Sequence, residues 1–276
     1  MGYSSSKRRK MKRIDLNQIE HAVKIGDQCP SFEPNITEDC IFYADGEHIG
    51  FFMRQIPEKM CKLADIANAE FNSKNVPKTE MSRGPQGSKK DKIERAKAGI
   101  ELVTQMSVIL GGVPPKPHMR RPYPTISSVH QVKSAQTFIK AMLLLAKESE
   151  KLIAEIMPGQ YQRQKELFNQ VSDEWKFGSL FTSSISNYNI SAPFHRDTGN
   201  IKNTVNVIIT KRRNSKGGNL HVPHYGATID QCDNSILVYP AWRNVHGVTP
   251  IEPTFEGGYR NSLVFYPLNA FLELKH

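Results

Sequence analysis

Cysteine is scarce in this sequence, and long hydrophobic runs are absent from it. The four cysteines, Cys29, Cys40, Cys61 and Cys232, form no C-x-x-C pair, and no histidine stands near them at zinc-finger spacing. We therefore expect free thiols. No apolar run approaches the roughly 18 residues that a membrane-spanning helix needs, and no secretory segment is visible. We therefore expect an intracellular protein that does not enter a membrane.

Acidic residues are too few to balance the basic ones. Thirty-seven Lys and Arg residues against 27 Asp and Glu residues leave a formal net charge of +10. This surplus favours a polyanionic partner such as nucleic acid, although a soluble protein with a basic tail shows the same balance. The basic block from Lys7 to Arg13 is typical of a nuclear-import signal or a phosphate-binding arm, and equally of a solvated terminus without a function.

The chain also lacks internal repeats and is too short for two full-sized domains. A hydrophobic content of 38% over 276 residues is enough to bury one sizeable core. Residues 1–35 show little apolar periodicity, and we expect a disordered basic arm there. A single domain should follow over residues 36–276. It divides into a support region, residues 36–174, and a strand-rich region, residues 175–276.

The support region carries both helix and strand signals. Asp45-Gly46 lies between two strand-like runs and predicts a hairpin, and Pro57 is suited to the first position of a helix. A long amphipathic pattern predicts a helix from about Ser134 to Met157 that ends before Pro158. The proline-rich, basic segment 114–124 is suited to phosphate contacts, with a solvated linker as the alternative.

The strand-rich region consists of short strand-like runs separated by turn residues. The clearest runs are residues 205–210, 235–239 and 262–266. Several short strands without helices between them indicate an antiparallel sandwich or jelly roll. We therefore expect the α+β class, with a double-stranded β-helix core, an N-terminal α/β support and buttressing helices.

Three metal-binding side chains fall within these strands. His195 and Asp197 form an H-x-D pair, and His246 follows Asp197 by 49 residues. The intervening residue places both side chains of the pair on one side of an extended segment. Two imidazoles and one carboxylate are the facial triad of non-haem Fe(II) oxygenases. An isolated H-x-D pair is weak evidence, so further residues have to support a metal site.

Arg260 is the residue that strengthens this interpretation. It lies 14 residues beyond His246, on a predicted strand, and is followed by Ser262. An arginine there can bind the distal carboxylate of 2-oxoglutarate in a bidentate pair. His221 and His224 could compete as metal ligands, but neither has a carboxylate partner at short spacing. We place His221 near the cosubstrate and consider His224 structural.

These residues resemble a known family. From His195 to Phe265 the sequence is similar to the TET/JBP dioxygenases, which oxidise 5-methylcytosine or thymine in DNA with Fe(II) and 2-oxoglutarate. The segment that begins at His195 resembles the TET iron motif HRDxxNxxN. Further similar segments are Leu220-His221-Val222 (LHV), Asn234–Leu237 with His246 and Thr249-Pro250, and Arg260–Tyr266 (RxSLVFY).

The resemblance implies roles for individual residues. It assigns the iron to His195, Asp197 and His246, the cosubstrate to Arg260, Ser262, His221 and Arg83, and the target base to Asn200. The assignment of Arg83 depends on the similarity of Ile56-Pro57 and the helix after it. Fe(II), 2-oxoglutarate and O₂ are the implied cofactor and cosubstrates. Tyr188, Tyr225 and Trp242 are aromatic candidates for the base pocket, and each is also consistent with a place in the core.

The resemblance also implies a reaction on methylated DNA. The methyl group of 5-methylcytosine would be oxidised to 5-hydroxymethylcytosine and onward to 5-formyl- and 5-carboxylcytosine, after the base is flipped out. The alternatives are thymine hydroxylation as in JBP, an RNA or protein substrate, and an inactive DNA-binding module on the same fold. We expect a monomer located with the DNA, in the nucleus of a eukaryote or the cytoplasm otherwise. The chain lacks the cysteine-rich region and long insert of animal TET enzymes.

Overall fold

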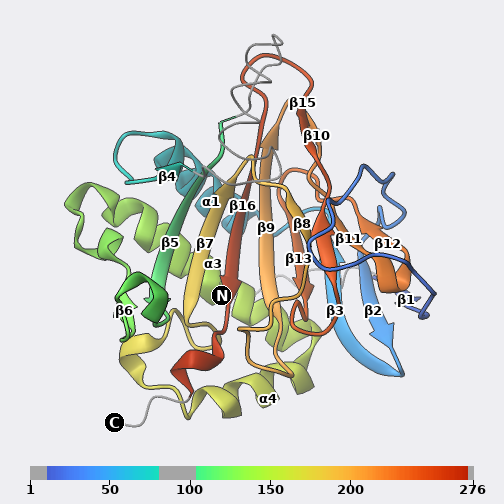
Figure 1. Ribbon diagram of the computed structural model, residues 1–276, viewed down its shortest axis with the longest axis horizontal. Helices are drawn as coiled ribbons and strands as arrows, with labels where there is room; N and C mark the ends of the chain where they lie inside the picture. Colours follow the sequence, from blue (N-terminus) through green and yellow to red (C-terminus); the bar gives the residue numbers. More distant parts are fainter. Residues whose placement is uncertain (1–10, 81–103, 273–276) are drawn as a thin grey trace, which may run out of the picture.

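The computed structural model describes residues 11–80 and 104–272. Within these ranges, ten strands form one mixed sheet in the order β1-β2-β3-β13-β9-β16-β7-β5-β4, with β6 paired to β5 (Figure 1). The strands of this large sheet are β1 (Lys12–Asp15), β2 (Cys40–Ala44), β3 (Glu47–Met53), β4 (Thr79–Glu80), β5 (Met106–Val113), β6 (Thr125–Ile126), β7 (Ser183–Tyr188), β9 (Asn206–Arg213), β13 (Ser235–Tyr239) and β16 (Tyr259–Tyr266).

Two smaller sheets and several helices complete the described part of the chain. The small sheet has the order β12-β11-β14-β8, from β8 (Ala192–His195), β11 (Leu220–Val222), β12 (Ala227–Ile229) and β14 (His246–Val248). A two-stranded ribbon joins β10 (Ser215–Gly217) to β15 (Ile251–Pro253). The helices are α1 (Glu58–Asn72), α3 (Gln136–Ile156) and α4 (Pro158–Phe168), with short 3-10 turns η1 (Pro117–Met119), η2 (Ser128–Gln131), η3 (Lys133–Ala135), η4 (Asp173–Trp175), η5 (Pro223–Tyr225) and η6 (Asn269–Phe271).

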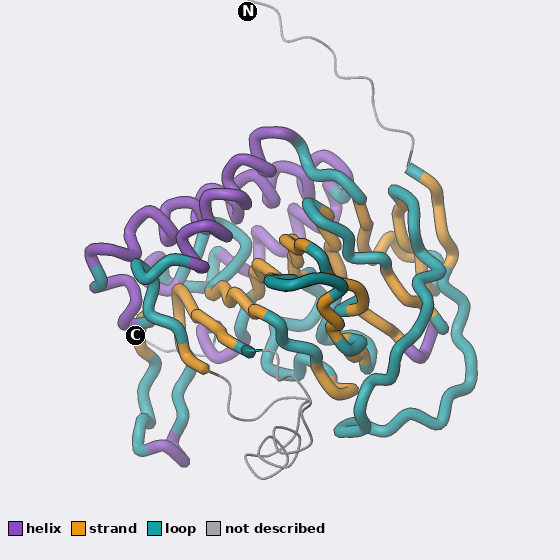
Figure 2. The backbone as a smooth tube through the Cα atoms, turned by 90° about the horizontal axis from the view of Figure 1, so that it is seen from above, coloured by secondary structure: helices purple, strands orange, loops and turns teal. Residues whose placement is uncertain are grey.

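The large sheet lies between two layers. Figure 2 shows the helices along one side of the strands and the shorter strands and loops on the other. Strand β13 shows how alternation of side chains builds both layers. Ile236 and Val238 belong to the hydrophobic cluster that includes α1 and α3, whereas Leu237 and Tyr239 belong to the cluster that includes β11 and β12. This arrangement confirms the expected α+β fold with a double-stranded β-helix core.

Helix α3 is the main support of the sheet. Phe138, Met142 and Leu145 are fully buried on its sheet-facing side, and each such side chain contributes about 1.5–3 kcal/mol relative to an exposed one. Met157 separates α3 from α4, which begins with Pro158 at its first position. The prediction of a long helix ending before Pro158 is confirmed, as are the hairpin at Asp45-Gly46 and the three strand-like runs, found in β9, β13 and β16.

The prediction of a disordered arm over residues 1–35 was wrong for residues 11–35. Strand β1 pairs in parallel with β2 at the edge of the large sheet. Further along, the backbone N–H of Ile19 donates to His224 O, and that of Gly26 donates to Phe194 O. Such a segment is held by backbone hydrogen bonds with few buried side chains, which explains its weak apolar periodicity. Residues 1–10 lie outside the described ranges.

The division at residue 174 is not a structural boundary of the sheet. Strands β3 and β5 from the first part pair directly with β13 and β7 from the second. We propose that residues 36–276 form one domain and that residues 11–35 pack along it. Among the described residues, no helix is both long enough and apolar enough to cross a membrane.

Candidate functional site

A cavity of about 480 Å³ opens between the large and the small sheet. Strands of both sheets line it, among them β7, β9 and β16 on one side and β8 and β14 on the other. His195, Asp197 and His246 lie on its wall, and so do Asn200, Arg260 and Ser262. Six of the eight site residues predicted from the sequence therefore face one cavity.

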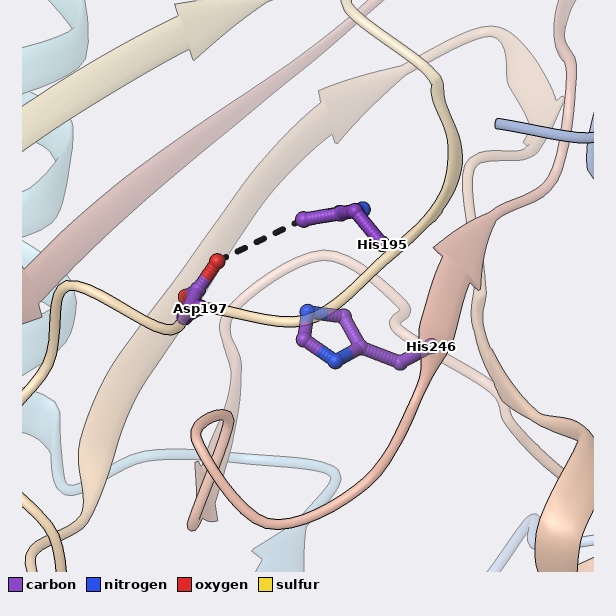
Figure 3. Close-up of side chains that lie close together, drawn as sticks. All are labelled: His195, Asp197 and His246. Atoms are coloured by element: carbon purple, nitrogen blue, oxygen red, sulfur yellow. Dashed lines mark ion pairs between the residues drawn. The ribbon is translucent and has the colours of Figure 1, made fainter. Parts of the chain in front are cut away.

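His195, Asp197 and His246 converge at the small sheet (Figure 3). His195 ends β8, Asp197 lies in the following loop, and His246 begins β14, directly opposite His195 in the antiparallel pair. One ligand atom from each residue can be chosen so that all three lie within 4.8 Å of one another. This spacing allows one metal ion to contact all three.

The backbone determines which nitrogen each histidine offers. His195 Nδ1 lies 2.8 Å from Pro193 O, and His246 Nδ1 lies 3.0 Å from Asn244 O. Because a carbonyl oxygen only accepts hydrogen bonds, each Nδ1 carries the proton and each Nε2 keeps its lone pair. Burial, together with the nearby His195 ring, lowers the pKa of His246, which favours the neutral form that binds metals.

Two asparagines hold the carboxylate of Asp197. Asn206 Nδ2 donates to Asp197 Oδ2 at 3.2 Å, and Asn200 Nδ2 approaches the same oxygen at 3.5 Å. Asn200 Nδ2 also donates to Asn206 Oδ1 at 2.9 Å, so the three side chains form one network. Asp197 Oδ1 remains directed toward His195 Nε2, at 3.5 Å. The donor set of two Nε2 atoms and Oδ1 fits a divalent metal such as iron.

Arg260 provides a cation at another part of the cavity wall. It is 2% exposed, and its Nη2 donates to Gln231 Oε1 at 3.0 Å. Its Nε has no hydrogen-bond partner among the described residues. Burial and the neighbouring Arg212 lower the pKa of Arg260, because the charge is desolvated and lies near a like charge. Ser262 lies two residues further on the same strand face. A ligand carboxylate would therefore satisfy this guanidinium.

His221 is a predicted site residue that does not line the cavity. Leu220, its neighbour on β11, does so instead. The His221 ring stacks on Phe32 with 3.7 Å between centroids, and its Nδ1 lies 2.8 Å from Thr228 Oγ1. Burial lowers the pKa of His221 to about 4, so this ring is neutral. Its position does not support the predicted contact with the cosubstrate. Arg83 lies outside the described residues.

The three aromatic candidates for the base pocket do not line the cavity either. Tyr188 stacks on Tyr259, and the Trp242 indole N–H donates to Thr204 O at 2.8 Å. The aromatic rings on the cavity wall are instead those of Tyr239 and Tyr266, and burial raises the pKa of both hydroxyls. The alternation of side chains between the two faces of a strand could have indicated Tyr266. It lies an even number of residues from Arg260 and Ser262 on β16 and therefore on the same face.

Comparisons with known proteins agree with this geometry. Residues 115–269 match the Tet_JBP model, described as the oxygenase domain of the 2OGFeDO superfamily. A structure described as NgTET1 in complex with 5mC DNA aligns with a TM-score of 0.56 and 13% identity, over 90% of this chain and 85% of that one.

Two further solved structures align at lower similarity, OsALKBH1 and a Burkholderia pseudomallei oxidoreductase of the 2OG-Fe(II) oxygenase family. Their TM-scores are 0.37 and 0.34, at 10% and 13% identity, over 79% and 74% of this chain and 96% and 88% of theirs. No curated protein matches significantly. Since the family model covers more than half of the chain, the protein belongs to the Tet_JBP family of 2-oxoglutarate- and iron-dependent oxygenase domains.

Proposed function

We propose that this protein is an Fe(II)- and 2-oxoglutarate-dependent dioxygenase that converts 5-methylcytosine in DNA to 5-hydroxymethylcytosine, and onward to 5-formyl- and 5-carboxylcytosine. One observation carries the proposal. In a Tet_JBP domain, three metal-binding side chains and a buried arginine without an anionic partner among the described residues line the same cavity. Its volume of about 480 Å³ is within the range of roughly 300–1,000 Å³ usual for small-molecule sites.

The iron site would consist of Nε2 of His195, Nε2 of His246 and Oδ1 of Asp197. Three protein ligands on one face leave further positions for the cosubstrate and O₂. When bound, iron and 2-oxoglutarate supply the oxidising chemistry that an unactivated methyl group requires. The protein contributes orientation: two backbone carbonyls fix the imidazoles, and Asn206 with Asn200 fixes the carboxylate.

Arg260 and Ser262 would bind the distal carboxylate of the cosubstrate. Both are buried, both line the cavity, and both lie on β16. An unpaired buried guanidinium is costly, and a charge-assisted pair with a carboxylate removes that cost. The metal site and Arg260 thus provide one anchor for each end of a dicarboxylate.

Asn200 favours cytosine as the target base. Its Nδ2 group is directed to Asn206 and Asp197, which leaves its Oδ1 to accept a hydrogen bond. The exocyclic amino group of 5-methylcytosine can donate to that oxygen, whereas thymine has a carbonyl at the same position. A methyl group inside stacked duplex cannot reach a cavity between two sheets, so the base has to be flipped out, at a cost of a few kcal/mol.

The DNA backbone would be bound by basic residues on the cavity wall and in the proline-rich loop. The net charge of +10 supports a polyanionic partner, Arg196 lies on the cavity wall, and Lys116, Arg120 and Arg121 lie in the proline-rich loop. The likeness to a TET structure that holds DNA with 5-methylcytosine adds support at the level of the fold.

Nucleoside mass spectrometry tests this function. The protein is incubated with Fe(II), 2-oxoglutarate, O₂ and a 5-methylcytosine-containing duplex, with Asp197→Ala as the inactive control. We expect 5-hydroxymethylcytosine from the wild type alone. Oxidised thymine without oxidised methylcytosine would instead support the JBP-like activity. Succinate formation without any oxidised base would indicate an RNA or protein substrate, and neither product would favour an inactive module.

A further inference from the structure

Gln231 lies beside Arg260, in the loop between β12 and β13. Its side chain is 1% exposed and lines the cavity. Its Oε1 accepts from Arg260 Nη2 at 3.0 Å, while its Nε2 has no hydrogen-bond partner among the described residues. A buried amide N–H group without a partner costs about 1–3 kcal/mol. No motif in the sequence includes this residue.

The backbone of Gln231 is held on both sides. Its N–H donates to Asn219 Oδ1 at 3.2 Å, and its carbonyl accepts from Arg212 Nη1 at 3.1 Å. Arg212 is fixed in turn by Gly217 O, at 3.0 Å. The backbone position of Gln231 is therefore set by the protein itself.

The partner of Oε1 also determines the orientation of the amide. A guanidinium only donates hydrogen bonds, so the atom of Gln231 that faces Arg260 has to be the oxygen. The amide nitrogen, Nε2, is then the atom that does not contact Arg260. Arg260 Nε and Gln231 Nε2 are thus two buried donors without partners, on neighbouring side chains of one cavity wall.

A carboxylate can satisfy both donors at once. It has two oxygens and about four lone-pair sites. Its negative charge also provides the anionic partner that the Arg260 guanidinium does not have among the described residues. We propose that Gln231 is a second residue that binds the distal carboxylate of 2-oxoglutarate, by donating from Nε2 next to Arg260, and that it helps the site select a dicarboxylate. This inference rests on the proposed function.

The test measures binding, separately from turnover. N-oxalylglycine, an unreactive analogue with both carboxylates, is titrated by calorimetry into protein loaded with Mn(II) in place of iron. Oxalate, which chelates a metal but has no distal carboxylate, serves as the comparison ligand. For Gln231→Leu we expect about tenfold weaker binding of N-oxalylglycine, the loss typical of a hydrogen bond to a charged group, and unchanged oxalate binding.

Gln231→Glu gives a second variant. A carboxylate there keeps an acceptor for Arg260, removes the donor and repels the ligand, so we expect a larger loss than for Gln231→Leu, again without an effect on oxalate. Gln170→Glu and Gln170→Leu make the same changes at an exposed position and should bind both ligands normally. Thermal melting of every variant shows whether the fold is retained.

Gln231 could instead act only through Arg260, and a double mutant separates the two roles. In an Arg260→Ala background, Gln231→Leu should weaken N-oxalylglycine binding about fivefold further, because the amide would contact the ligand itself. Unchanged binding in that background, or wild-type affinity in both single variants, would overturn the inference. A wild-type protein that binds neither ligand and forms no succinate would overturn the proposed function itself.

Discussion

His195 and His246 face each other across the antiparallel pair of β8 and β14, with 4.4 Å between their ring centroids. A strand pair of this kind brings together two residues that are far apart in sequence. The third ligand, Asp197, follows His195 by two residues, so the local chain direction places it beside both rings. The candidate metal site is therefore a consequence of strand pairing, and its geometry should survive changes to the ligands themselves.

Replacing any of the three candidate ligands should abolish turnover and leave the fold intact. His195→Ala, Asp197→Ala and His246→Ala each remove one of three metal-binding atoms, and an open metal site contributes more to chemistry than to packing. Metal content after loading and 2-oxoglutarate-dependent succinate formation measure the loss, while circular dichroism melting measures stability. Wild-type activity in any of these variants would exclude that residue as an iron ligand.

Arg260 should show opposite effects on cosubstrate affinity and on stability. Arg260→Met removes the carboxylate contact, so the KM for 2-oxoglutarate should rise by about 100-fold. The same change removes a buried charge that has no anionic partner among the described residues, so the protein without cosubstrate should melt at the same or a higher temperature. An unchanged KM would remove Arg260 from the site.

The candidate ligands on the cavity wall could be predicted from the sequence more easily than the residues that hold them in place. The H-x-D pair, His246 and Arg260 could be found because their residue types match the chemistry of such a site and their order resembles that of the TET/JBP family. Asn206 and Gln231 could not, because each acts through contacts that depend on how β9 and the β12–β13 loop meet the rest of the fold. These contacts are set by tertiary packing, for which a single sequence carries no periodic signal.

The positions of His221 and of residues 11–35 could not be predicted from the sequence for a related reason. The LHV segment forms strand β11, and the residue of this strand that lines the cavity is Leu220. Phe32, from the segment expected to be disordered, covers the His221 ring. The surroundings of His221 and the path of residues 11–35 both depend on backbone hydrogen bonds between this segment and the rest of the fold. A single sequence carries no pattern that predicts such bonds.

Asn206 should act on the metal through Asp197. Asn206→Ala removes the donor at 3.2 Å from Asp197 Oδ2, and loss of such a supporting contact typically weakens metal affinity 10- to 100-fold. Asn169→Ala makes the same change at an exposed position and should have no effect. Metal titration monitors both variants. Equal affinity in the two would show that Asp197 does not need this support.

Gly218 should be required for the position of Arg260. A Cβ atom at Gly218 would lie 2.4 Å from Arg260 Cδ, so Gly218→Ala should displace the arginine and weaken 2-oxoglutarate binding. Gly257 provides a matched control, because both glycines have φ of +67° but a Cβ at Gly257 would meet its nearest neighbour at 3.5 Å. Both variants should lose about 1 kcal/mol of stability from backbone strain, and only Gly218→Ala should lose affinity. Equal affinities would refute this role.

We propose that oxidation depends on the methyl group of cytosine in DNA. The most direct measurement compares succinate formation with one duplex in two forms, identical except for 5-methylcytosine in place of cytosine, at equal Fe(II), 2-oxoglutarate and salt concentrations. The methylated duplex should stimulate succinate formation, with about one succinate for each oxidation step, counting the steps to the formyl and carboxyl products separately. The unmethylated duplex should yield no oxidised cytosine. Equal succinate formation with both duplexes, and no oxidised methylcytosine, would show that 5-methylcytosine in DNA is not the substrate.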